Sequence, residues 1–125
     1  MSLVSAFQQQ SPTIAIVTSA TPSTASSTTI NWPLLVGGVQ VGPNTPPGQV
    51  RVRSPAANTG DVFVSFNGGD TATIPSGTTY SNEMPVAPNS VEVFGGVSRS
   101  GKSVVVNVIS SVASQTIYLT FGEGL

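Results

Sequence analysis

The sequence predicts an all-β fold: an antiparallel β-sandwich or jelly roll with an extended N-terminal arm. Three observations lead to this prediction. The 125 residues are rich in β-branched valine and threonine, which fit a pleated, half-buried surface. Thirteen glycines and ten prolines divide the chain into short segments. No segment places apolar residues at helical spacing over more than about two turns.

Residues 1–33 are predicted to form the arm. Residues 8–12 and 18–29 are low in complexity, and the arm contains no charged residue. Two apolar pieces interrupt it, one at 14–17 and one formed by Ile30 and Trp32. Either piece can add a strand to a sheet of this chain or of a neighbouring subunit. If the arm is separate from the domain, deleting residues 1–33 should leave a folded protein.

Four apolar side chains of the arm are the candidate interface residues: Phe7, Ile14, Ile16 and Trp32. A polar arm with little core of its own needs a surface to order against, and a neighbouring subunit provides one. The alternative, which the sequence leaves equally open, is that these side chains pack on their own domain.

Residues 34–125 are predicted to form the jelly-roll domain. An apolar run at 34–41 contains Gly37 and Gly38, and period-2 alternation at 49–53 turns Val50 and Val52 inward. Further strands are expected at 62–66, 71–74, 90–94, 103–109 and 115–121, with a hairpin turn at 67–70 and an edge strand or loop at 80–86. The apolar run at 103–109 indicates a strand buried on both faces.

Charge excludes one class of function. The formal net charge is −1, and 7% of the residues are charged, against about 25% in a typical soluble domain. The basic residues are Arg51, Arg53, Arg99 and Lys102, too few to neutralise many phosphates, so no nucleic-acid partner is expected. A surface with so little charge gains little solubility from repulsion, which favours a protein covered by partners.

The compartment is indicated only by absences. Without cysteine the chain has no disulfide, and its first residues lack the basic and apolar regions of a secretory signal. No apolar run reaches the roughly 18 residues of a membrane span. The sequence therefore predicts a protein made in a cytoplasm, with no membrane partner.

Catalysis is not expected. Without histidine or cysteine, a Ser-His-Asp or Cys-His arrangement cannot form. Gly96 and the run Gly101-Lys102-Ser103 match the spacing of a phosphate-binding loop, but a predicted strand follows where that loop requires a helix. This stretch is interpreted as a turn, and no catalytic residue, cofactor or metal site is predicted.

The acidic and aromatic residues are given structural roles. Glu92 and Glu123 are expected to pair with Arg51 or Arg53 across a sheet, and Asp70 lacks the ligand spacing of a calcium loop. The aromatic residues interpreted as core or interface anchors, with a sugar-binding platform as the alternative, are Trp32, Tyr80, Phe94 and Phe121.

Residues 49–125, about three-fifths of the chain, carry a series of motifs in a recognisable order. They are Val-Arg-Val at 50–52, Asn-Thr-Gly at 58–60, Val-Phe-Val-Ser-Phe at 62–66, Val-Glu-Val-Phe at 91–94 and Gly-Glu-Gly at 122–124. In this order they resemble a group of small virion proteins of tailed bacteriophages. The arm lies outside this pattern.

The resemblance implies a jelly-roll capsid decoration or cement protein, related to head fibres and without enzymatic activity. It implies a location on the virion surface after synthesis in the host cytoplasm. The expected partners are the major capsid protein and further copies of the chain, as a dimer or trimer. The alternative function is a receptor- or glycan-binding domain of a virion fibre or spike.

Overall fold

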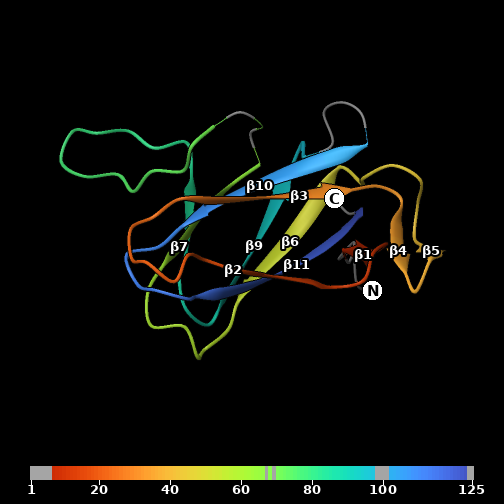
Figure 1. Ribbon diagram of the computed structural model, residues 1–125, viewed down its shortest axis with the longest axis horizontal. Helices are drawn as coiled ribbons and strands as arrows, with labels where there is room; N and C mark the ends of the chain where they lie inside the picture. Colours follow the sequence, from red (N-terminus) through yellow and green to blue (C-terminus); the bar gives the residue numbers. More distant parts are fainter. Residues whose placement is uncertain (1–6, 67, 69, 98–101, 124–125) are drawn as a thin grey trace, which may run out of the picture.

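The strands of this protein form two antiparallel sheets and one separate hairpin. The structure, a computed structural model, describes residues 7–66, 68, 70–97 and 102–123 (Figure 1). All regular elements in these ranges are strands, which confirms the predicted all-β antiparallel sandwich. Among the described segments, no helix has the length and apolar character needed to cross a membrane.

The first sheet has five strands. They are β1 (Gln8–Gln9), β2 (Ile14–Val17), β6 (Gln49–Ser54), β9 (Ser90–Gly95) and β11 (Thr116–Glu123). Their order is β1-β11-β6-β9, and β2 also pairs with β11, so β1 and β2 share one edge and β9 forms the other.

The second sheet has four strands in the order β3-β10-β7-β8. They are β3 (Ser26–Asn31), β7 (Val62–Ser65), β8 (Met84–Val86) and β10 (Ser103–Ile109). Strands β4 (Leu34–Val36) and β5 (Val39–Val41) pair only with each other. Gly37 and Gly38 form their two-residue turn, with φ of 60° and 80°, as a type I′ hairpin requires.

The pairing of the sheet strands is nested. Apart from the short β1 and the β4–β5 hairpin, β2 pairs with β11, β3 with β10, β6 with β9 and β7 with β8. The β11–β6 and β10–β7 ladders then join these pairs into the two sheets. The chain therefore runs as one long antiparallel hairpin wrapped into two layers.

The core lies between the layers and is mainly valine. Alternation along each strand sends every second side chain inward. The inward residues with the lowest exposure are Val50, Val52, Val62, Val64, Val86, Val104, Val106, Val108, Ile117, Leu119 and Phe121. Burying one such side chain contributes about 1.5–3 kcal/mol, so this set supplies most of the driving force for folding.

The predicted division at residue 33 does not match the structure. Strand β2 pairs with β11 in register Ile16 to Ile117, and β3 pairs with β10 along six positions. Trp32 is buried in the core. The described part of the expected arm, from residue 7 onward, supplies edge strands of both sheets because its apolar residues complete the same core.

Most of the predicted strands are confirmed within one or two residues, but the one at 71–74 is wrong. Both sides of β7, the strand that precedes this segment, are already paired, with β10 and with β8, so residues 71–74 cannot form a hairpin with it. They lie in the long β7–β8 connection instead. The predicted hairpin turn at 67–70 includes Asn67 and Gly69, which lie outside the described residues. Strand β8, which carries Pro85, is an edge strand as expected.

Candidate interaction surfaces

All four predicted interface residues lie against β11 of their own chain. Ile16 and Trp32 are each 4% exposed and belong to the core, and half-buried Ile14 packs against it. Ile14 pairs with Leu119 in the ladder. Phe7 lies beside Gly122. A Cβ added to this glycine would be 2.7 Å from the Cζ atom of the Phe7 ring. These four side chains therefore pack on their own domain, which is the alternative that the sequence left open.

The predicted pairing of Glu92 and Glu123 with the two arginines is not found. Glu92 is opposite Val52, so it points to the face of the sheet that Arg51 and Arg53 avoid. The Glu123 carboxylate instead accepts a hydrogen bond from the Gly48 N–H, 3.0 Å away.

The arginines lie on the outer face of the first sheet. Arg51 is opposite Thr120 and Arg53 is opposite Tyr118, and together with Thr13 and Pro55 they line an open groove of about 600 Å³. The exposed Val91 and Val93 of β9 continue this face. The face thus mixes two guanidinium groups, a phenol ring and aliphatic side chains, a combination that suits a protein contact.

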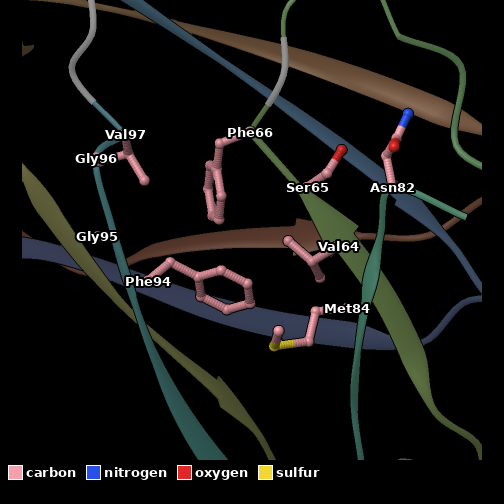
Figure 2. Close-up of a pocket in the computed structure, with 9 residues that line it drawn as sticks. All are labelled: Val64, Ser65, Phe66, Asn82, Met84, Phe94, Gly95, Gly96 and Val97. Carbon is pink, nitrogen blue, oxygen red and sulfur yellow. The ribbon is translucent and has the colours of Figure 1, made fainter.

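A smaller pocket of about 200 Å³ opens between β9 and the β7–β8 pair. Figure 2 shows the rings of Phe66 and Phe94 next to each other in its lining, with Met84 beside Phe94. The ring centroids are 5.2 Å apart at 64°, an edge-to-face contact. Ser65 and Asn82 add polar groups, and none of the nine lining residues is titratable. The pocket can accept an apolar group but offers no acid or base.

A buried network of hydrogen bonds adjoins this pocket at Ser65. Glu83, 7% exposed, accepts hydrogen bonds from the Ser65 hydroxyl at 2.7 Å, the Thr73 N–H at 2.8 Å and the Ser81 hydroxyl at 3.1 Å. Asn107 Nδ2 donates to Ser65 Oγ at 3.3 Å. The network attaches the β7–β8 connection to the outer face of the second sheet. This network was not predicted from the sequence, because no local pattern near Glu83 marks the residue as buried.

The β7–β8 connection carries one prominent aromatic residue. Tyr80 is 94% exposed, in contrast to Trp32 and Phe121, which are buried in the core. In Figure 1 this connection, coloured green to teal, projects from one end of the sandwich. Of the four aromatic residues singled out from the sequence, Tyr80 alone has the exposure that a binding platform requires.

The β4–β5 hairpin projects at the opposite end of the molecule in Figure 1. Leu34 pairs with Val41 and Val36 with Val39, so one face of the hairpin is entirely apolar. Leu34 packs against the core, whereas Val36 and Val39 are 59% and 65% exposed. An isolated two-stranded hairpin is only marginally stable in water. This projecting apolar tip is therefore a candidate for contact with a partner.

The run Gly101-Lys102-Ser103, interpreted from the sequence as a turn and not a phosphate-binding loop, leads into β10. Gly101 lies outside the described residues, whereas Ser103 begins β10, so a strand follows the Gly-Lys-Ser run as predicted. Within the described ranges, no three histidine, cysteine or acidic residues come together as metal ligands.

Comparison with known proteins adds no assignment: no family model, curated protein or solved structure matches the chain.

Proposed function

We propose that the protein is a non-enzymatic structural component of a tailed-phage virion. In this proposal it has a jelly-roll fold and sits on the capsid surface, where it bridges capsomers and stabilises the shell. Its partners are the major capsid protein and further copies of itself.

The nested strand pairing supports the jelly-roll part of the proposal. A jelly roll has eight strands in two sheets and arises when a long antiparallel hairpin is wrapped on itself. Counting β2, β3 and β6 to β11 as first to eighth, the sheets run first-eighth-third-sixth and second-seventh-fourth-fifth. This order results from pairing the first strand with the last, the second with the seventh and so on inward, together with the β11–β6 and β10–β7 ladders that join the pairs.

The observation that carries the functional proposal is the lack of charged residues in the first fifty positions. No charged residue occurs before Arg51. This stretch supplies β1 to β5, including the hairpin tip with exposed Leu35, Val36 and Val39. Large apolar side chains on an uncharged element favour burial against another protein. The Tyr80 connection at the other end of the molecule gives a second point of attachment, which suits a bridging role (Figure 1).

The test compares two double variants in binding to capsids of the phage that encodes the chain. Val36→Ser with Val39→Ser removes the hairpin contact, and Met84→Ser with Val93→Ser is the control, since these side chains are 53% and 54% exposed and lie outside the first fifty residues. Burial of two valines is worth about 2 kcal/mol or more, so the hairpin variant should bind at least about tenfold more weakly. Equal binding by both variants contradicts the hairpin contact, and no binding by the wild-type protein contradicts the capsid role.

A receptor- or glycan-binding domain of a virion fibre is the second candidate function, and Tyr80 favours it. The exposed ring lies on a long connection next to the polar residues Ser81 and Asn82. Aromatic faces with nearby amides are suited to sugar contacts. Binding on a glycan array that Tyr80→Ala abolishes would support this function over capsid decoration.

A further inference from the structure

Three of the four outer edges of the sandwich are protected against pairing with another chain. The shared edge of β1 and β2 consists of two short pieces, with Pro12 between them. Strand β8 contains Pro85, which cannot donate a ladder hydrogen bond. Strand β9 carries Glu92, which points to the core-facing side. Prolines, short strands and inward-pointing charges are devices by which native edges avoid sheet-to-sheet association.

The fourth edge, β3, has none of these devices. Its six residues, Ser26–Asn31, contain no proline and no charge. All six pair with β10 on one side, and no strand in the described part of the chain pairs with β3 on the other. Ser27, Thr28 and Thr29 are exposed. A regular row of backbone donors and acceptors is therefore open to a further strand.

We propose that β3 pairs with β3 of a second copy of this chain, antiparallel across a two-fold axis. The two four-stranded sheets then become one continuous sheet. The inference rests on the proposed function, because it names the surface through which copies of the protein meet. A two-fold axis through the middle of the strand places its central residues beside their own copies, so a charge there would repel itself. The uncharged β3 has no such penalty.

The register of this pairing follows from the faces of the sheet. Residues directly opposite each other must share a face, and Thr28 and Ile30 point inward while Ser27 and Thr29 point outward, as their partners on β10 show. The faces stay continuous only if the two-fold axis passes between one residue and its own copy in the other chain. Near the centre of β3, this residue is Thr28 or Thr29. Either choice places threonine opposite threonine, a pair that stabilises neighbouring strands.

Disulfide cross-linking tests the pairing, because the chain contains no cysteine of its own. Thr28→Cys and Thr29→Cys are made separately, and Val91→Cys on the protected edge β9 is the control. Directly opposed strand residues lie within the Cα separation that a disulfide spans. At least one threonine variant should give nearly complete cross-linking into a dimer under mild oxidation, whereas the control should not. Equal, weak cross-linking of all three variants overturns the proposal.

A second measurement uses the mass in solution. Wild-type protein should sediment at twice the chain mass of 12.7 kDa, and Thr28→Lys with Thr29→Lys should sediment as a folded monomer. The matched control, Val91→Lys, should stay dimeric. A monomeric wild type, or a dimer that survives both lysines, overturns the inference. Capsid binding reports on the proposed function separately, because a monomer that still binds capsids contradicts only the β3 pairing.

Discussion

The indole of Trp32 meets the ring of Phe121 edge to face, with the centroids 5.2 Å apart and the planes at 80°. The contact joins the end of the predicted arm to the last strand of the sheet. Together with the ladders of β2 and β3, it makes residues 14–17 and 26–32 part of the sandwich. The N-terminal region therefore stabilises the fold that presents the hairpin and the β3 edge.

Replacing Trp32 tests this integration. Trp32→Ala should lower the free energy of unfolding by about 3–5 kcal/mol, because it leaves a large cavity against Phe121. Trp32→Phe should cost less, since it keeps a ring and removes an Nε1 that is buried without a hydrogen-bond partner. Urea denaturation measures both. Equal losses for the two variants would contradict the proposed ring packing.

Deleting residues 1–33 should prevent folding, contrary to the expectation from the sequence. The deletion removes β2, β3 and Trp32, and so exposes the core-facing side chains of β10 and β11. Circular dichroism and the dispersion of amide signals in NMR spectra check this result. A truncated protein with a cooperative unfolding transition would show that the N-terminal third is a separable arm after all.

A glycine in β11 is required by the close approach of β1. A Cβ at Gly122 would lie 2.1 Å from the Gln8 carbonyl oxygen, which leaves no room for alanine. Gly122→Ala should therefore destabilise the protein by about 1–3 kcal/mol and speed proteolysis near residue 8. The control is Gly95→Ala in β9, where a Cβ meets no atom within 4 Å, and its stability should stay within about 0.5 kcal/mol of wild type. Similar effects at both glycines would contradict the docking of β1.

Removing the carboxylate of Glu83 should loosen the β7–β8 connection. In Glu83→Gln, one acceptor oxygen becomes a donor, so a buried hydroxyl or the Thr73 N–H loses its partner. The expected cost is about 1–3 kcal/mol, with faster hydrogen exchange at the Thr73 amide. Glu92→Gln, at an exposed position, should change neither quantity. Unchanged protection of the Thr73 amide in Glu83→Gln would show that the network does not hold the connection.

Asn58 should be sensitive to loss of its amide. Its Nδ2 donates to Ser54 Oγ at 2.8 Å and to the Thr116 carbonyl at 2.7 Å, while its Oδ1 accepts from the Thr116 N–H at 3.1 Å. Asn58→Asp removes both donations and should cost about 2–3 kcal/mol in thermal or urea unfolding. The exposed Asn44→Asp is the control, with an expected change below about 0.5 kcal/mol. A stable Asn58→Asp protein would contradict the role of this side chain in holding the β6–β7 connection to β11.

How far the sequence predicts this structure depends on the range of the interactions. Alternation along 49–53 and the apolar run at 103–109 correctly predict β6 and β10, because side-chain period alone decides which face is buried. The role of residues 14–17 depends instead on pairing with β11, about a hundred residues away, and no local pattern specifies that partner. The prediction of a strand at 71–74 is wrong for the same reason.

The candidate surfaces show the same limit. The sequence shows only an apolar run around Gly37 and Gly38, whereas the structure shows that this run is a hairpin and that Val36 and Val39 are exposed on it. The openness of β3 becomes evident only once β10 is known to occupy its other side. Conversely, the burial of Trp32 removes a residue that sequence alone offered as an interface anchor.

Cryo-electron microscopy of capsids mixed with this chain, or of particles that contain it, tests the proposed capsid role most directly. The proposal predicts density for the sandwich on the outside of the capsid shell, at symmetry-related positions, with the β4–β5 hairpin against the major capsid protein. Particles whose shells lack this density, or that carry the chain at the tip of a fibre, would contradict capsid decoration.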